Sequence, residues 1–366
     1  MTARNPMDAR TDSPWTAAPG ANAETSPILL VPYMWIGDFV RCHSVVQVLK
    51  ERWPRRPVDL LMTTLTTPLV DYMPGVRRGI LADLPRGRLG WRENLDLARR
   101  LRREGYGSAL IMSRKWKAAL APFLAGIPER TGYVGEARYG LLNDPRSGER
   151  QIARMLDQCA ALALPPGAPW PPAWPMPSLQ VSDAELTAWR ARRGLEPNGP
   201  VVALCPGAVG PSKRWPSDRY GALAAALVQQ GAAVWVLGSP AEQPLAAEIV
   251  AAAGGRARGL TSTDLRDAVL ALAAADLVVS NDSGLLHVAA ALGTPAIGIF
   301  GPTAPQLWAP VNPVAAIIET TTVVPCRPCH KPTCRLGHHA CMRDIGAERL
   351  IAVATQVLGG KLAGAP

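Results

Sequence analysis

A chain of 366 residues is too long for one ordinary hydrophobic core and indicates two domains. Hydrophobic residues make up 48% of the chain and charged residues 19%, a balance that favours a globular protein and excludes a membrane-embedded one. Most of the net charge of +10 falls in residues 1–183, where 24 Lys and Arg stand against 17 Asp and Glu. This excess indicates an anionic partner for the first half or, equally well, a solvated arginine-rich helix at residues 98–104.

Residues 1–26 are predicted to form a disordered N-terminal tail. They mix Pro, Ala, Gly, Asp and Arg and contain no apolar stretch of the kind that a secretory signal peptide needs. We therefore expect a cytoplasmic protein. In the reducing cytosol the seven cysteines are not expected to form structural disulfides.

Strand-like and helix-like segments alternate along the next part of the chain. Strands are predicted at 27–33, 58–63 and 108–112, and helices at 38–53 and 92–105. A turn-rich stretch separates the second strand from the second helix. Such alternation is typical of a parallel sheet built from β-α-β units, so we expect a Rossmann-like N-terminal domain over residues 27–161.

Seven prolines fall between residues 162 and 179, which excludes a helix interior or a central strand there. We expect a Pro-rich linker over residues 162–182. A second alternating series then predicts a Rossmann-like C-terminal domain over residues 183–345, followed by a C-terminal helix and tail over residues 346–366. Its strands are predicted at 201–207, 233–239, 276–282 and 296–300, and its helices at 217–230, at 241–253 and after residue 284.

The predicted fold class is α/β, with two Rossmann-like domains whose parallel sheets face an interdomain cleft. Open parallel sheets bind ligands beyond the carboxyl ends of their strands, so the loops that follow the strands should carry the chemistry. The chain contains neither a GxGxxG fingerprint nor a GxxxxGK[ST] loop. This argues against a dinucleotide-dependent dehydrogenase and against a P-loop NTPase.

The first such loop, "MWIGDFV" at residues 34–40, places Asp38 where a helix begins. Asp is among the best N-cap residues, which gives one interpretation of this position. A carboxylate that faces the cleft can instead take the proton from an attacking hydroxyl group. Position alone leaves both interpretations open.

The second loop, "CPGAVGPSKRWP" at residues 205–216, follows the first strand of the second series. Its glycines, among them Gly207, let the backbone approach a ligand closely. Lys213 and Arg214 can bind phosphate without a metal ion. The alternative is a solvent-facing basic turn.

The third loop, "SNDSG" at residues 280–284, leads into an alanine-rich helix. Free N–H groups and the positive end of the helix dipole after Gly284 favour an anion. Ser283 adds a hydroxyl donor, and Asp282 is suited to accept hydrogen bonds from sugar hydroxyl groups. His287 lies inside the helix, where a packed residue is the commoner case. We expect a nucleotide diphosphate over the N-terminus of this helix.

Four segments of the chain share their sequence and their order with one known family. They are "IGDFV", "FLAGIPERTGYVGEARYGLLND", "CPGAVGPSKRWP" and "SNDSGLLHVAAALGTPAIGIFGPT". From about residue 28 to about residue 310 the chain resembles the ADP-heptose:lipopolysaccharide heptosyltransferases of glycosyltransferase family 9, above all the type II members. The resemblance implies a GT-B fold and an inverting, metal-independent transfer of heptose from ADP-heptose to the heptose of the lipopolysaccharide inner core.

The resemblance also implies roles for individual residues. Asp38 matches the catalytic base, Lys213 matches the lysine that binds the diphosphate, and Glu242 matches an acidic position near the adenosine ribose. No catalytic cofactor is expected, since no Asp-x-Asp pair occurs to hold a divalent cation on the diphosphate. The donor-binding residues that we predict are Lys213, Asp282, Ser283, Gly284, His287, Glu242 and Gly207.

The resemblance also suggests what the positive charge of the first half binds. The acceptor that the resemblance implies is the inner core on Kdo-lipid A, which carries carboxylates and often phosphates. Lys117 and Arg138 match the family best as acceptor-binding residues, and Arg114 is a further candidate. Because this acceptor is anchored in lipid, we expect a membrane-surface contact through it, at the cytoplasmic face of the inner membrane.

Three other functions remain open at this level. The first is a heptosyltransferase that acts on another core position or on an autotransporter protein, and the second is a nucleotide-sugar epimerase. The third is a basic, zinc-bearing nucleic-acid binder, which would show steeply salt-dependent binding. The charge is diffuse and no recognition motif is present, so we expect no nucleic-acid partner.

The segment "CRPCHKPTCRLGHHACM", residues 326–342, lies beyond the matching region. Some related heptosyltransferases carry a four-cysteine metal site, which favours a structural zinc or iron ion here. Six residues separate the later cysteine pair and three histidines are alternative ligands, so reduced cysteines without a metal are the other interpretation. The candidate ligands are Cys326, Cys329, Cys334 and Cys341.

Overall fold

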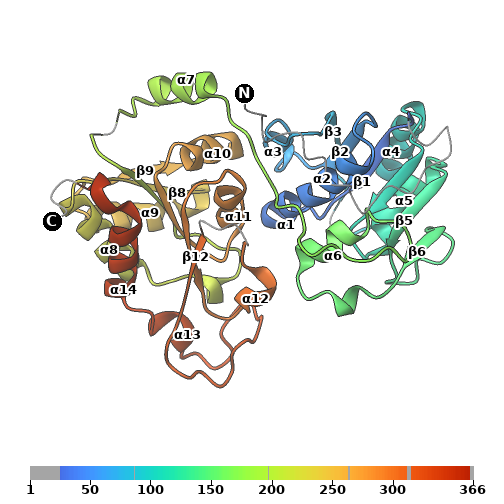
Figure 1. Cartoon of the computed structure of the whole chain (residues 1–366). Helices are drawn as coiled ribbons and strands as arrows, with labels where there is room; N and C mark the ends of the chain where they lie inside the picture. Colours follow the sequence, from blue (N-terminus) through green and yellow to red (C-terminus); the bar gives the residue numbers. More distant parts are fainter. Residues whose placement is uncertain (1–24, 86, 197, 263, 311–314, 363–366) are drawn as a thin grey trace, which may run out of the picture.

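The structure is a computed structural model that describes residues 25–85, 87–196, 198–262, 264–310 and 315–362. Its named strands form two six-stranded sheets in which every strand pair is parallel. Figure 1 shows the two sheets side by side, each packed against helices. The predicted α/β fold with two Rossmann-like units is therefore confirmed. The predicted tail falls almost wholly outside the described residues.

The first unit begins with a strand at the centre of its sheet. Its strands are β1 (Ile28–Val31), β2 (Val58–Met62), β3 (Arg78–Leu81), β4 (Ser108–Ile111), β5 (Glu129–Tyr133) and β6 (Asp144–Arg146). Its helices are α1 (Ile36–Arg41), α2 (His43–Arg52), α3 (Thr67–Val70), α4 (Trp91–Arg103), α5 (Trp116–Leu124) and α6 (Met155–Ala161), with a 3₁₀ turn at Glu149–Gln151. The strand order across the sheet is β3-β2-β1-β4-β5-β6.

The second unit repeats this plan. Its strands are β7 (Val201–Cys205), β8 (Ala233–Gly238), β9 (Arg258–Thr261), β10 (Leu277–Asn281), β11 (Ala296–Phe300) and β12 (Ala315–Glu319). Its helices are α7 (Asp183–Arg193), α8 (Ser217–Gln229), α9 (Gln243–Ala252), α10 (Leu265–Ala273), α11 (Gly284–Ala291), α12 (Pro305–Trp308), α13 (Ala340–Arg343) and α14 (Ala347–Leu358), with 3₁₀ turns at Pro211–Lys213, Pro240–Glu242 and Gly359–Lys361. The strand order is β12-β11-β10-β7-β8-β9.

The strand order determines where a ligand can bind. In each sheet the chain moves from the centre to one edge, returns to the centre and then moves to the other edge. The direction reverses between β1 and β4 in the first sheet and between β7 and β10 in the second. Open α/β sheets bind their ligands in the crevice at this switch point, so the loops after these four strands are the candidate site.

The sequence pattern identified the buried central strands and missed the outer ones. The central strands β1, β4, β7 and β10 are buried along their whole length, as their apolar runs predict. The outer strands β3, β5, β6, β9 and β12 were not predicted. All of them except the mainly apolar β12 are short segments interrupted by Gly, Pro or charged residues, which weakens the strand pattern. The helix predicted at 38–53 is two consecutive helices that meet at Cys42, where ψ is −13° and therefore less negative than in a regular α-helix.

The Pro-rich segment between α6 and α7 is attached to both units. The backbone N–H of Leu179 donates to the carbonyl of Ala291 in the second unit at 2.8 Å, and that of Gln180 donates to the carbonyl of Tyr72 in the first unit at 2.8 Å. Trp174 is buried within the hydrophobic cluster that both units share. The segment is therefore a packed part of the interface between the units.

The two units approach each other most closely where α1 packs on α11. A Cβ atom on Gly37 would lie 2.7 Å from Cδ2 of His287 and 3.4 Å from the Cα of Gly284. A Cβ atom on Gly284 would lie 2.8 Å from the Cβ of Ile36. Glycine is required at both positions because the two backbones leave no space for a side chain.

We predict that Gly37→Ala lowers the free energy of unfolding by about 1–3 kcal/mol, the typical cost of overpacking. Helix propensity alone favours Ala over Gly by roughly 0.5–1 kcal/mol and would therefore stabilise the variant. A decrease in the free energy of unfolding thus identifies the steric effect. Chemical denaturation measures it, with Gly259→Ala as the control, because a Cβ atom at Gly259 meets nothing within 4 Å. Equal effects of the two substitutions would contradict a tight contact between α1 and α11.

Candidate active site

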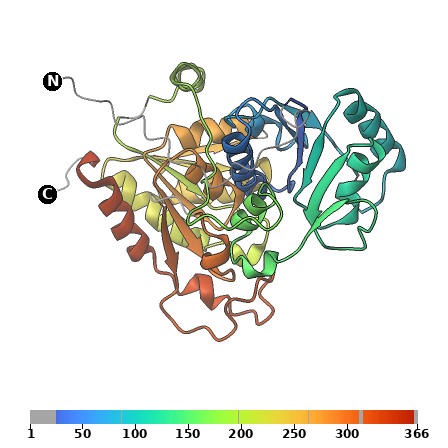
Figure 2. The ribbon, with the colours of Figure 1, turned by 45° about the vertical axis from the view of Figure 1, so that its right-hand side comes forward.

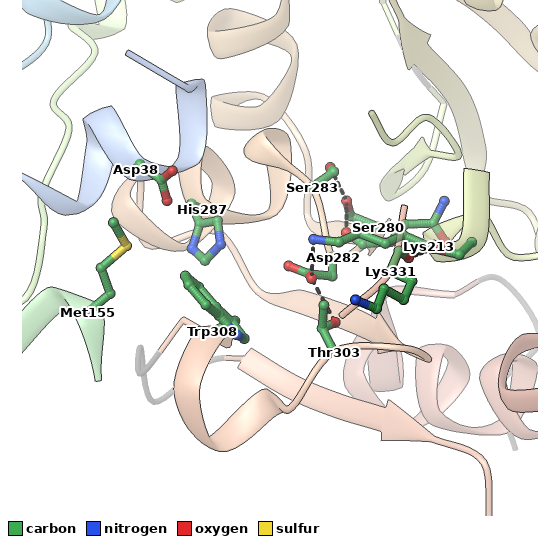
Figure 3. Close-up of polar contacts among 12 residues, drawn as sticks. Asp38, Met155, Lys213, Ser280, Asp282, Ser283, His287, Thr303, Trp308 and Lys331 are labelled. Carbon is green, nitrogen blue, oxygen red and sulfur yellow. Dashed lines mark hydrogen bonds and ion pairs between the residues drawn. The ribbon is translucent and has the colours of Figure 1, made fainter. Parts of the chain in front are cut away.

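Four of the predicted site residues lie close together between the two units. Asp38 comes from the loop and first helical turn after β1, Lys213 from the loop after β7, and Asp282 and His287 from the loop and helix after β10. Figure 3 shows Asp38 and His287 on one side of this group and Lys213, Asp282 and Ser283 on the other. The switch points of the two sheets therefore face the same site.

A partly buried ion pair joins the two loops of the second unit. Nζ of Lys213 donates to Oδ2 of Asp282 at 2.7 Å, and the same oxygen accepts from the hydroxyl of Thr303 at 2.8 Å. Asp282 and Thr303 are buried, whereas the side chain of Lys213 keeps 34% exposure. The carboxylate therefore positions Lys213 and compensates its charge, while the ammonium group remains accessible. Sequence reasoning missed Thr303, which follows β11.

The N-terminus of α11 has no side-chain cap. Its N-cap residue, Ser283, makes no side-chain hydrogen bond to the first turn, and its hydroxyl lies 3.1 Å from the hydroxyl of Ser280. Asn281 fixes the preceding loop, because its side chain accepts from the backbone N–H of Trp215 and donates to the carbonyl of Pro206. The first N–H groups of the helix are therefore not capped by a side chain and can bind an anion.

Asp38 lies in the first turn of α1 and does not cap the helix. The helix begins two residues earlier and its N-cap is Trp35, so the interpretation of Asp38 as an N-cap is wrong. Burial raises the pKa of the Asp38 carboxyl group, the positive charges of Arg41 and Lys213 oppose that rise, and Asp282 adds to it. A carboxylate with a raised pKa is a stronger base, as proton abstraction requires.

Arg41, which sequence reasoning missed, connects the two units at the site. Its guanidinium group donates to Oδ1 of Asp38 at 2.7 Å, to Nε2 of His287 at 2.7 Å and to the carbonyl of Trp308 at 2.8 Å. The side chain is only 8% exposed and lines a cavity that both units enclose, together with Arg154. Its spacing of three residues from Asp38 on a helix was the available signal.

His287 is held in one tautomer by Arg41. A guanidinium group has no acceptor, so Nε2 of His287 must accept and Nδ1 carries the proton. Burial lowers the pKa of His287 well below its ordinary value, and the charges of Arg41 and Lys213 lower it further. The imidazole is therefore neutral at physiological pH.

Two further predicted donor residues meet at the edge of the site. The carboxylate of Glu242 lies against Gly207, where a Cβ atom would approach Oε1 of Glu242 to 1.7 Å. Oε2 of Glu242 accepts from the backbone N–H of Ser239 at 2.7 Å and from its hydroxyl at 3.0 Å. The first of these bonds is one half of a capping box, in which the Ser239 side chain in turn accepts from the backbone N–H of Glu242. The structure thus explains the glycine and gives Glu242 a local structural role, while its contact with a ribose stays a prediction.

The predicted acceptor residues differ in how exposed they are. Arg114 is half-exposed and pairs with Glu149 at 3.3 Å, and Lys117 donates to the carbonyl of Arg88 at 3.0 Å. Arg138 is 4% exposed, and its guanidinium group donates to the carbonyls of Ser113 and Tyr133. Arg138 therefore supports the loop after β5, and Arg114 and Lys117 are the more accessible cations.

The Cys-rich segment lies beside the second unit and packs on its donor-side loops. Burial raises the pKa of the Cys341 thiol to about 11, Arg327 opposes that rise, and Cys329, Cys326 and Cys334 add to it. Yet within the described ranges no three Cys, His, Asp or Glu side chains lie close enough to hold a metal ion. As placed, the four cysteines do not form a complete ligand set.

Comparisons with known proteins agree with this geometry. Residues 94–340 match the family model described as glycosyltransferase family 9 (heptosyltransferase). Lipopolysaccharide heptosyltransferase 2 of Escherichia coli is 35% identical over 338 residues, covering 88% of this chain and 96% of the relative. The solved ADP-heptose lps heptosyltransferase II of E. coli is 33% identical, with a TM-score of 0.80 over 91% of this chain and 98% of that chain. E. coli heptosyltransferase WaaC with ADP shares the fold, with a TM-score of 0.69, 16% identity and coverage of 90% and 99%.

These matches, together with two parallel sheets that share one site, define a glycosyltransferase with a GT-B-like fold. Within that class the chain belongs to glycosyltransferase family 9, the heptosyltransferases.

We predict that Arg41→Met raises the pKa of His287, because it removes one of the two positive charges beside the imidazole. Burial and Lys213 remain, so the pKa should stay below its ordinary value. Nitrogen NMR of the histidine rings measures this, and the chain has only five histidines to assign. Arg154→Met is the control, since Arg154 lines the same cavity but pairs with Asp157. An unchanged His287 titration in Arg41→Met would contradict the coupling.

Proposed function

We propose that this protein transfers heptose from ADP-heptose to the heptose of the lipopolysaccharide inner core. The names of its relatives support the donor and the class of acceptor. The observation that carries the proposal is the convergence of Asp38, the Lys213–Asp282 pair and the uncapped N-terminus of α11 on one site. This set provides a base, a cation and an anion-binding helix end.

The donor diphosphate would lie over the N-terminus of α11. Lys213 and the first N–H groups of this helix supply positive charge there, and Ser283 supplies a hydroxyl group. Gly207 and Glu242 lie together after β7 and β8 and would face the adenosine. Asp282 and His287 are left to orient the sugar.

In the reaction that we propose, Asp38 accepts the proton of the attacking acceptor hydroxyl. The hydroxyl oxygen forms a bond to the anomeric carbon while the bond from that carbon to the diphosphate oxygen breaks, and ADP leaves with the electron pair. Attack from the opposite face inverts the anomeric configuration. Lys213 and the end of α11 stabilise the charge that develops on ADP.

The electrostatics support transfer without a metal ion. Oδ2 of Asp282 already accepts hydrogen bonds from Lys213 and Thr303, so this oxygen holds a lysine in the place where a metal ligand would stand. The lysine and the helix end place positive charge where other transferases use a divalent cation. We propose that cationic groups of this chain provide the charge stabilisation in place of a metal ion.

The acceptor would bind on the side of the first unit. Arg114 and Lys117 offer positive charge after β4 and at the start of α5, with Arg138 behind them. These charges suit the carboxylates and phosphates of an inner core. No helix in the described part of the chain is long and apolar enough to cross a membrane. We propose that contact with the cytoplasmic face of the inner membrane occurs through the acceptor.

The acid–base role of Asp38 leads to a rate prediction. Asp38→Ala should lower the rate of heptose transfer by roughly 10²–10⁴-fold, because a positioned base contributes about that much. ADP should still bind, since Asp38 lies on the other side of His287 from Lys213. A mass shift of one heptose on a defined core acceptor measures turnover, and calorimetry measures ADP binding. Turnover of Asp38→Ala close to that of the wild type would remove Asp38 from the mechanism. If the wild-type protein converts ADP-heptose but adds no heptose to the acceptor, it is an epimerase.

Metal removal separates catalysis from structure. Transfer should persist in excess EDTA, and strict dependence on added magnesium or manganese would contradict the mechanism.

We propose in addition that a zinc or iron ion stabilises the Cys-rich segment, for which its cysteines would have to move together. Elemental analysis of protein purified without chelator should then give about one metal ion per chain, the content of a single four-thiolate site. Four freely titratable thiols and no bound metal would contradict this second proposal.

A further inference from the structure

The Cys-rich segment forms part of the wall of the site. Figure 2 shows the chain between β12 and α14 as a loop at the lower edge of the second unit. The backbone N–H groups of Cys329 and His330 donate to the carbonyl of Pro302 at 3.0 and 2.9 Å. Pro302 is the neighbour of Thr303, whose hydroxyl bonds Asp282. The segment is thus attached to the loop that follows β11.

The same segment is attached to the loop of Lys213. The backbone N–H of Ser212 donates to the carbonyl of Pro332 at 3.0 Å, and its hydroxyl donates to the carbonyl of Lys331. Ser212 is buried and its own carbonyl bonds Nε2 of His339 at 2.7 Å. Lys331 is therefore held at its own carbonyl and at both neighbouring residues.

Lys331 belongs to the stretch of the segment that is bonded to the donor-binding loops. Its carbonyl accepts from the hydroxyl of Ser212, the neighbour of Lys213, and the view of Figure 3 draws its side chain near Asp282 and Thr303. It is exposed, and no ion pair to Lys331 occurs among the described residues. Its ammonium group therefore has no carboxylate that compensates its charge within the described part of the chain.

The negative charge of a diphosphate favours a further cation at the site. Asp282 compensates the charge of Lys213, so the pair contributes little net charge. The end of α11 supplies roughly half an elementary charge. A nucleoside diphosphate carries at least two negative charges at neutral pH, and these exceed what the pair and the helix end supply. An additional cation at the site would meet this excess.

We infer that Lys331 is a second diphosphate-binding lysine, which the Cys-rich segment contributes to the donor site. The inference rests on the proposed donor site at α11. The ammonium group of Lys331 pairs with a phosphate oxygen of the donor and remains paired with ADP after transfer. The Cys-rich segment therefore takes part in binding a nucleoside diphosphate.

The experiment compares ADP with adenosine, which lacks the phosphates. Lys331→Ala should weaken ADP binding by about 10-fold or more, the usual effect of losing one charge-assisted contact. Calorimetry without divalent cations measures ADP, and ligand-observed NMR measures adenosine, whose binding should not change. Lys331→Arg should restore most of the ADP affinity. An equal loss for adenosine would assign Lys331 to folding of the loop and overturn the inference.

Two further variants complete the test. Arg335→Ala removes another exposed cation of the same segment and should leave ADP binding unchanged. An equal loss in this variant would mean that the effect is one of overall charge, which overturns the inference. Lys213→Ala should also weaken ADP binding. If Lys213→Ala weakens it and Lys331→Ala does not, the inference fails and the donor site stands. If neither does, the donor site itself is wrong.

Discussion

The site depends on how closely α1 of the first unit approaches α11 of the second. Neither Gly37 nor Gly284 has a Cβ atom, and the backbones meet at a distance that any side chain would prevent. Asp38 follows directly after this contact, and Arg41 reaches across it to His287 and to the carbonyl of Trp308. A site that two units share needs a fixed separation, and this contact supplies it without a flexible side chain between the two halves.

The charged groups of the site are arranged in pairs that hold each other in place. Lys213 pairs with Asp282 and Arg41 with Asp38, each at 2.7 Å. A buried charge without a partner is costly, so pairing lets these groups occupy a partly dry interface. It also leaves the ligand-free site close to neutral, and a negatively charged ligand then interacts with any cation that is not already paired. A negatively charged ligand is therefore recognised by the few positive charges at the site that no carboxylate compensates.

The sequence predicted the parts of the site that follow strands and could not predict their partners. Asp38, Lys213 and Asp282 stand after strands with clear apolar runs, so their loops could be located from the pattern alone. The hydrogen bond of Arg41 to His287 spans 246 residues, and no local pattern encodes a pair at that separation. The outer strands were missed because weakly buried positions lose the hydrophobic signal. The exposure of a charged side chain cannot be read from the sequence either. Arg138 resembles a surface cation in the sequence, but in the fold it is buried and donates to a backbone carbonyl.

The Pro-rich segment ties one short stretch of chain to both units. Leu179 and Gln180 are neighbours, yet their hydrogen bonds go to opposite units, so a translation of one unit relative to the other stretches at least one of these bonds. One of these bonds is at Ala291, the last residue of α11, whereas Ser283 lies at the other end of the same helix. With a rise of about 1.5 Å per residue, α11 is roughly 10 Å long, and a rotation of about 10° about Ala291 would displace its N-terminus by about 2 Å. The close contact of Gly284 with α1 opposes such a displacement. The Pro-rich segment therefore lies where a hinge between the two units would be. The length of α11 determines how far a small rotation at this hinge would move the anion-binding end of that helix.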